Sequence, residues 1–126
     1  MNKVLATLSV GTLMALAAPG VANAKAGDVI VSGKCSAAST SKLKLSPDNG
    51  RIEVEFDVDQ NVVGHLWKVR ISDNGTLVAR AKATTTAPSG SFTVGRRITN
   101  LAGTDMVTAT AKNTVTGERC SATASI

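Results

Sequence analysis

Cys35 and Cys120 are the only cysteines in this chain of 126 residues, and their thiols can form one disulfide bond. An even number of cysteines behind an N-terminal export signal favours that bond, because exported proteins meet an oxidising environment. The bridge would close a loop of about 85 residues, worth about 4.5 kcal/mol in the chain-entropy model. Two free thiols, or a bond between two chains, are the alternatives. We predict a structural disulfide without catalytic duty.

His65 is the only histidine, so a Ser-His-Asp or Cys-His arrangement would have to use it. It follows Gly64 at the expected entrance of a strand, and no convergent nucleophile accompanies it. One histidine without such a partner offers no catalytic geometry. We therefore predict that the protein is not an enzyme and that it needs no cofactor.

Four acidic residues spaced by two lie on one face of an extended strand: Glu53, Glu55, Asp57 and Asp59. Such a strip suits a Ca²⁺ site or a recognition surface. A calcium loop, however, needs glycine where Val62 stands and a glutamate further on. The pattern favours a solvated face that pairs across strands with Lys68, Arg70 or other basic residues. We expect no metal ion.

A candidate binding patch consists of four basic residues whose strands could be neighbours: Arg80, Lys82, Arg96 and Arg97. Such a patch would attract anionic polymers, such as wall teichoic acids or acidic glycans. The alternative is an ordinary soluble charged surface. The basic residues are scattered and no aromatic side chains remain for base stacking, so we expect no nucleic-acid partner.

These side chains must be positioned by strands, because apolar and polar residues alternate with a period of two and helical periodicity is absent after residue 25. The clearest strand spans residues 51–59, and Asn49-Gly50 and Asn74-Gly75 are turn signals. Further strands are expected over residues 28–33, 65–72, 76–83, 92–98, 106–112 and 119–126, and a short piece over residues 42–45 is expected to continue an edge strand. The pattern predicts an all-β fold, an immunoglobulin-like antiparallel sandwich of about seven strands with one disulfide. A small barrel is the alternative.

Aromatic residues are scarce, since Phe56, Trp67 and Phe92 are the only three. Trp67 is flanked by alternating apolar residues on the third main strand, where this architecture often places a core tryptophan. We predict that Trp67 anchors the core.

The first 24 residues have the parts of a signal peptide. Lys3 gives the positive start, an apolar run follows, and Ala22-Asn23-Ala24 suits signal peptidase. The run is too short for a membrane helix, which needs about 20 residues, although an uncleaved anchor is the alternative. We expect cleavage after Ala24, leaving one domain over residues 25–126 with 13 basic and nine acidic residues, a net charge of +4. No later segment is apolar enough to span a membrane, so the protein is expected to be extracellular or associated with the cell envelope.

Several turn and strand segments carry a resemblance to a known group of proteins. They are Gly33-Lys34-Cys35, Gly64-His65-Leu66-Trp67-Lys68-Val69 with Asp73-Asn74-Gly75, Ser89-Gly90-Ser91-Phe92, and the stretch from Gly103 to Cys120. Over most of residues 25–126 the chain resembles small secreted bacterial proteins, actinobacterial in type, with one immunoglobulin-like or fibronectin III-like domain. The resemblance implies a fold and carries no functional residues.

Together these features predict a secreted, non-enzymatic binding or structural domain. Its expected partner is a cell-envelope component, an anionic glycan or a protein. The alternative is a hydrolase inhibitor or small-ligand carrier on the same scaffold. An inhibitor should present a rigid loop at residues 84–90, whereas a carrier should have an apolar cleft lined by Trp67, Phe56 or Phe92. A surface binder should gather basic residues on one face.

Overall fold

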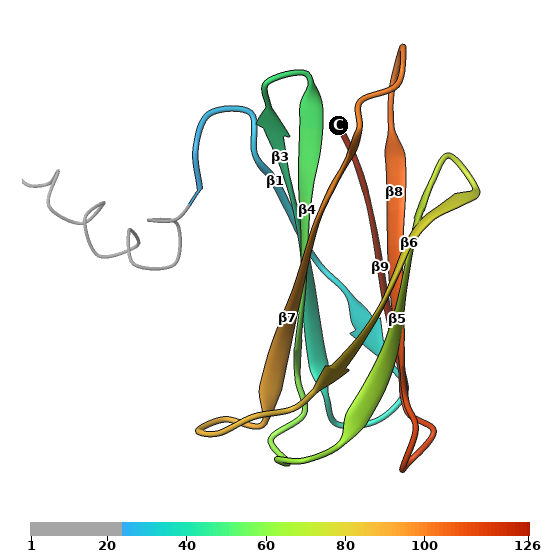
Figure 1. The fold of residues 1–126 in the computed structure, drawn as a ribbon. Coiled ribbons are helices and arrows are strands. Elements are labelled where there is room, and N and C mark those ends of the chain that lie inside the picture. Colours follow the sequence, from blue (N-terminus) through green and yellow to red (C-terminus); the bar gives the residue numbers. More distant parts are fainter. Residues whose placement is uncertain (1–23) are drawn as a thin grey trace, which may run out of the picture.

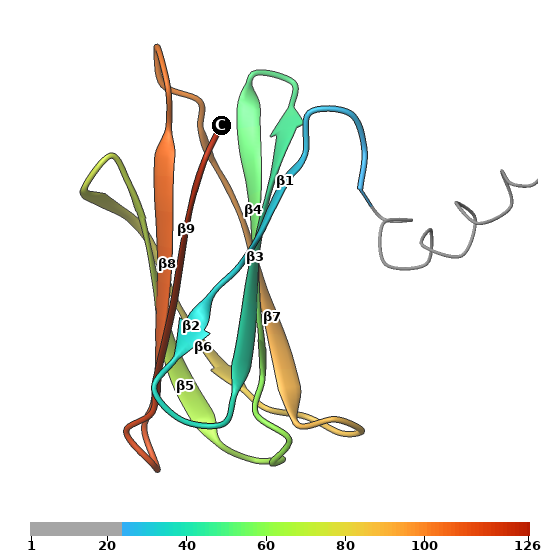
Figure 2. The same ribbon diagram turned by 180° about the vertical axis from the view of Figure 1, so that it is seen from behind.

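The computed structural model describes residues 24–126, so the predicted signal peptide lies outside the described residues except for Ala24. This part of the chain forms nine strands packed as two antiparallel sheets (Figures 1 and 2). The strands are β1 (Val29–Ser32), β2 (Lys34–Cys35), β3 (Thr40–Asp48), β4 (Arg51–Asp59), β5 (Leu66–Asp73), β6 (Thr76–Thr84), β7 (Ser91–Thr99), β8 (Met106–Asn113) and β9 (Arg119–Ser125).

One sheet has four strands in the order β1-β3-β4-β7, and the other has five in the order β2-β9-β8-β5-β6. Each sheet has its own edges, so the predicted all-β antiparallel sandwich is confirmed and the barrel alternative is wrong. The count exceeds seven partly because Lys34 and Cys35, which follow the first predicted strand, form a separate short strand, β2, in the other sheet. No helix in the described residues is long and apolar enough to cross a membrane.

The predicted alternation along β4 is confirmed, since Ile52, Val54, Phe56 and Val58 are all fully buried. The hairpin from β3 to β4 turns at Asn49 and Gly50, whose φ angles are 50° and 80°. Asn-Gly tolerates the positive φ that such tight hairpin turns require at both central positions. Asn74 and Gly75 make the same turn between β5 and β6, with φ angles of 49° and 85°.

Strand β3 is longer than the predicted residues 42–45. It pairs with β4 along its whole length, from Thr40 opposite Asp59 to Asp48 opposite Arg51. Pro47 lies inside this strand, opposite Ile52, although proline cannot donate to a ladder. It is tolerated because β1 ends its pairing with β3 at Leu45, so no strand on that side needs a donor from Pro47.

Trp67, the predicted core anchor, is fully buried. Its ring lies 5.9 Å from that of Phe92 between centroids, at an interplanar angle of 53°. The indole Nε1 donates a hydrogen bond of 3.0 Å to Gln60 Oε1 at the edge of the core. The polar end of the indole is therefore satisfied while its rings stay in the core.

Gly33 lies where the chain leaves β1 in one sheet for β2 in the other. Its backbone N–H donates to Ser41 O at 2.9 Å. A Cβ atom at this position would lie 2.6 Å from the Ser121 carbonyl oxygen, closer than such contacts allow. Glycine thus lets the first strand segment serve both sheets, and it delivers Lys34 and Cys35 to the edge of the five-stranded sheet.

Candidate functional site

The outward face of the five-stranded sheet is covered with cationic side chains. All seven are exposed, and they come from every strand of that sheet. We call them the basic face: Lys34, Lys68, Arg70, Arg80, Lys82, Lys112 and Arg119. The inward positions of the same strands hold buried residues such as Trp67, Val69 and Ala111. Strand alternation therefore sorts the cations to one side of the sheet.

Strand register places several of these cations directly opposite one another. Lys68 on β5 faces Lys82 on β6 and Lys112 on β8, while Lys112 also faces Arg119 on β9. Arg70 faces Arg80 in the next outward position. Like charges directly opposite in a sheet are destabilising, typically by roughly 0.2–1 kcal/mol per pair. The fold therefore tolerates a repulsive arrangement that its core does not require.

No carboxylate offsets this charge on the basic face within residues 24–126. The five-stranded sheet has one acidic residue in its strands, Asp73, and its side chain is buried on the inward side. The ion pairs among the described residues all lie elsewhere, at Lys42–Asp57, Lys44–Asp28 and Arg97–Asp48. The positive potential of the face is therefore not neutralised by the protein.

The basic face is also hollowed, with an open groove of about 1110 Å³. Small residues such as Thr110, Ser121 and Ala81 form part of its lining. All seven cations of the basic face line it as well. Lysine and arginine carry apolar stems, so the sides of the groove are aliphatic while the charged ends reach water. Such a groove can hold an anion against several cations at once.

The predicted patch of four basic residues is divided between the two sheets. Arg80 and Lys82 lie on β6 and belong to the basic face, whereas Arg96 and Arg97 lie on β7 of the four-stranded sheet. Arg97 is paired with Asp48, at 2.6 Å between Nη2 and Oδ2. Arg96 occupies an inward position opposite Val54 but is exposed at the edge of the sheet. The structure thus brings only Arg80 and Lys82 together.

Sequence reasoning missed five members of the basic face: Lys34, Lys68, Arg70, Lys112 and Arg119. A signal for them existed in the alternation of polar and apolar residues. On several predicted strands the polar positions carry cations and no acids. Using that signal would have required the strand order, which joins β2 and β9 to β5 through β8.

The four-stranded sheet carries the predicted acidic strip on its own outward side. We call this the mixed face; its charged members are Lys42, Lys44, Asp48, Arg51, Glu53, Glu55, Asp57, Asp59 and Arg97. The strip lies across from basic residues as predicted, but Lys68 and Arg70 are not among them, because they belong to the other sheet. Lys42 instead lies opposite Asp57 and pairs with it at 3.7 Å. Thr93 Oγ1 donates to the same carboxylate at 2.6 Å.

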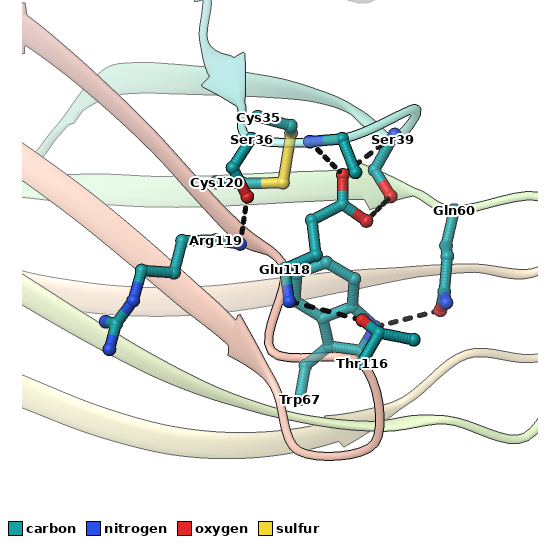
Figure 3. Close-up of a disulfide and its surroundings, with 10 residues drawn as sticks. Cys35, Ser36, Ser39, Gln60, Trp67, Thr116, Glu118, Arg119 and Cys120 are labelled. Atoms are coloured by element: carbon teal, nitrogen blue, oxygen red, sulfur yellow. Dashed lines mark hydrogen bonds between the residues drawn. A yellow bond between two sulfur atoms is a disulfide. The ribbon is translucent and has the colours of Figure 1, made fainter.

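The predicted disulfide joins Cys35 and Cys120, which lie directly opposite each other on β2 and β9 with Cα atoms 4.0 Å apart (Figure 3). The bond lies within the five-stranded sheet, unlike a bridge between the two sheets of a sandwich. It fastens the short strand that carries Lys34 to the strand that carries Arg119. The disulfide therefore holds one edge of the basic face.

Glu118 reinforces this edge by binding the loop between β2 and β3. Its Oε2 accepts hydrogen bonds from the backbone N–H groups of Ala37 at 3.1 Å and Ser39 at 3.0 Å, and Oε1 accepts one from Ser39 Oγ at 2.6 Å. Figure 3 shows the Arg119 side chain directed away from this carboxylate. Arg119 therefore stays available to the groove.

Cys35, Glu118 and Cys120 form the one cluster of three potential metal ligands among the described residues. Both sulfur atoms are consumed by the disulfide, and the Glu118 carboxylate is occupied by the three hydrogen bonds of the neighbouring loop. A disulfide sulfur is not the thiolate that binds metals. The cluster is a structural joint.

His65 lies in a polar network at the end of the sandwich where β4 leads into β5. Its Nδ1 is 2.7 Å from Gln60 Nε2 and 3.1 Å from Asn113 Nδ2. Because Gln60 Oε1 already accepts from Trp67, the Gln60 amide nitrogen faces the imidazole, and Nδ1 is an acceptor. These contacts give His65 a role in positioning the strand entrance.

Asp73 and Asp105 form a buried acidic pair at the opposite end, with exposed fractions of 3 % and 0 %. One oxygen of each carboxyl group has no other hydrogen-bond partner, so a proton shared between them satisfies both. Burial raises the pKa of Asp73 to about 6, with further contributions from the hydrogen bond and the negative charge of Asp105. Asp105 Oδ2 also accepts from Leu101 N at 3.1 Å.

The three aromatic rings are packed inside the sandwich and none lines the groove of the basic face. Phe92 lines a smaller pocket on the four-stranded sheet together with polar residues such as Thr40 and Asp57, so the groove of the basic face is not the aromatic-lined cleft expected of a carrier. The loop expected of an inhibitor is fastened at its base, where Thr85 N donates to His65 O and Gly90 N donates to Thr86 O.

No protein-family model matches the chain, and a search of curated proteins finds no match.

Proposed function

We propose that this protein is a secreted, non-enzymatic binding domain whose basic face holds an anionic polymer at the cell envelope. The observation that carries the proposal is the gathering of seven exposed cations, with no carboxylate among them, around one groove. Charge gathered on one concave face concentrates anions near it and speeds their association. The proposal includes the predicted bacterial, actinobacterial-type origin.

The disulfide supports the extracellular part of this proposal, because such bonds persist in oxidising compartments. The contacts of His65 support the non-enzymatic part. Its Nδ1 faces two side-chain amides, and the partners of its ring among the described residues include no serine or cysteine. Binding through charge and hydrogen bonds requires no such nucleophile.

The test is retention of the oxidised mature protein on purified cell-wall fragments, measured as salt is raised. We expect retention at low salt and steep release as ionic strength rises, because polyanion binding releases condensed counterions. Fragments stripped of their anionic polymers should not retain the protein. Retention that ignores salt, or equal retention on stripped fragments, would overturn the proposal.

A matched pair of variants separates the basic face from net charge. Lys68→Gln/Lys112→Gln removes two cations from the basic face, and Lys42→Gln/Arg96→Gln removes two exposed cations elsewhere. We expect the first variant to lose at least about tenfold more affinity than the second, because only the first weakens the face that holds the polymer. Equal losses would mean that overall charge, and not this face, holds the polymer.

A further inference from the structure

The cations of the basic face form rows that run across the strands. The first row is continuous over four adjacent strands, from β6 through β5 and β8 to β9. Its members are Lys82, Lys68, Lys112 and Arg119. Neighbouring strands lie about 4.8 Å apart, so this row presents a cation at each step over roughly 14 Å.

The second row lies two residues away along the strands, at a distance of about 6.8 Å. It starts with Arg80 and Arg70 on β6 and β5, and it ends with Lys34 on β2. Between them the register places the hydroxyl side chains of Thr110 and Ser121. This row therefore has a gap in charge where the first row has none.

Along the direction of each strand, the row of outward cations is short. On β5 the outward residues are Lys68, Arg70 and then uncharged Ser72, and on β6 the pair Arg80 and Lys82 is followed by Val78 toward the turn. A ligand aligned with a strand would meet at most two cations. A ligand lying across the strands meets four in succession.

The groove provides charge but no aromatic platform. Base and ring recognition commonly uses stacking on aromatic side chains. The three aromatic residues of this chain are in the core, with Trp67 and Phe56 fully buried and Phe92 8 % exposed. The ligand that suits the face therefore carries its charges in a slender chain, and a concave groove suits such a chain better than a flat bilayer.

We infer that the basic face binds a linear polymer with phosphate groups in its backbone, held in an extended form, which crosses the strands along the first row from Lys82 to Arg119. This inference rests on the proposed function and names its ligand class and orientation. A phosphate polymer has its charge in the backbone itself, so consecutive charges can engage consecutive strands. Thr110 and Ser121 can donate hydrogen bonds to phosphate oxygens from the second row.

Inorganic polyphosphate of graded length is the probe, and calorimetry with the oxidised mature protein is the measurement. Affinity should rise steeply with length until a chain spans the four cations of the first row, and then only with the number of positions available along the chain. For four contacts the slope of log affinity against log salt should be about −3, at roughly 0.7 per contact for a single-stranded polyanion.

Two double variants, each of which loses two positive charges, test whether the polymer lies along the first row. Lys68→Gln/Lys112→Gln interrupts the first row, and Arg70→Gln/Arg80→Gln neutralises the paired cations of the second. We expect the first to lose at least about tenfold more affinity than the second and to reduce the salt slope by about 1.4. Both should fold at least as well as the parent, because each removes directly opposed like charges.

The outcomes distinguish this inference from the proposed function. If binding is salt-sensitive but both variants lose the same affinity, the polymer does not follow the first row. The proposed anion-binding face would still stand. Tighter binding to sulfated or uronic-acid glycans of equal charge, or to anionic lipid vesicles, would overturn the ligand class. No binding of any polyanion by the parent protein would overturn both.

Discussion

The two outward faces of this sandwich carry charge in opposite ways. On the mixed face, cations and carboxylates alternate across neighbouring strands, as where Lys42 lies opposite and pairs with Asp57. On the basic face, cations lie opposite cations, as at Lys68 and Lys112. Both faces are exposed and both cover the same core. Packing alone therefore does not explain why only one of them lacks acids.

The difference separates charge that is neutralised by pairing within the protein from charge that the protein leaves unneutralised. Exposed, alternating ion pairs contribute little to stability, and they also leave little net potential. Directly opposed cations reduce stability, and they gain a compensating partner only when an anion arrives. The basic face is thus the region where a cost to folding points to binding.

The largest effect on stability should come from the disulfide that joins β2 to β9 in the five-stranded sheet. Replacing both Cys35 and Cys120 with alanine removes a crosslink between residues 85 apart in sequence. We expect the free energy of unfolding to fall by about 2–4 kcal/mol, measured by urea denaturation. The loss should be greater at low salt, where the cations near β2 and β9 repel one another more strongly.

Reduction of the parent protein, checked by thiol quantification, is the control for packing changes in that double variant. An unfolding free energy that is unaffected by both treatments would contradict a structural role for the bridge.

Lys68→Glu should move stability and binding in opposite directions. The new carboxylate lies opposite Lys82 and Lys112, so two repulsive pairs become attractive. We expect a gain of about 0.5–2 kcal/mol in the free energy of unfolding, together with a loss of roughly 100-fold in polyphosphate affinity. Urea denaturation and calorimetry measure the two effects.

The mirror variant on the mixed face is Glu55→Lys, which creates a like-charged pair with Lys44. It should lower stability and leave polyphosphate affinity within about threefold, since its charge lies on the opposite sheet. If Glu55→Lys strengthened binding as much as Lys68→Glu weakened it, the two faces would not be distinct.

The sequence predicts much of this fold because its signals are local. Alternation fixes the buried side of β4, the pair Asn74-Gly75 turns the chain between β5 and β6, and an even cysteine count predicts the bridge. The sequence underestimates the length of β3 because pairing with β4, and not the strand's own hydrophobicity, maintains it.

The basic face is only partly predictable because it is a product of strand order. Lys82 and Arg96 lie on consecutive strands of the chain, β6 and β7, yet these strands belong to different sheets. Conversely, Lys34 and Arg119 are remote in sequence but lie on adjacent strands, because β2 pairs with β9. The side of a strand on which a residue lies follows from the local alternation. The sheet to which the strand belongs depends on pairing with segments that are distant in sequence.

The five-stranded sheet has no acidic residue on its outward face, but on its inward side Asp73 is buried next to Asp105. The native pKa of Asp73, about 6 against an ordinary 3.8, means that the native state binds this proton more tightly than the unfolded state. Its stabilisation is complete below about pH 3.8 and is lost as pH rises through 6. Asp73→Asn should therefore raise the free energy of unfolding at pH 7.5 by about 1–3 kcal/mol.

Urea denaturation of Asp73→Asn across about pH 3.5 to 7.5 is the measurement, and the decline between about pH 4 and 6 should flatten in the variant. A variant that is less stable than the parent at about pH 7.5 would show that the ionised carboxylate is needed, and that acids are not merely tolerated behind the basic face.

The smallest effect is expected on the mixed face, at the pair between Arg97 and Asp48. The hydrogen bond from Arg97 holds the pKa of Asp48 below its ordinary value. The stabilisation is consequently present above about pH 3.8 and is lost as pH falls through the lower native pKa. Arg97→Gln should lower Tm slightly at about pH 6 and not at about pH 2, with a smaller difference in roughly 1 M salt.

Arg96→Gln, one residue away with no acidic partner in an ion pair among the described residues, is the matched control. Equal shifts in Tm for the two variants would mean that net charge, and not pairing, distinguishes the mixed face from the basic one.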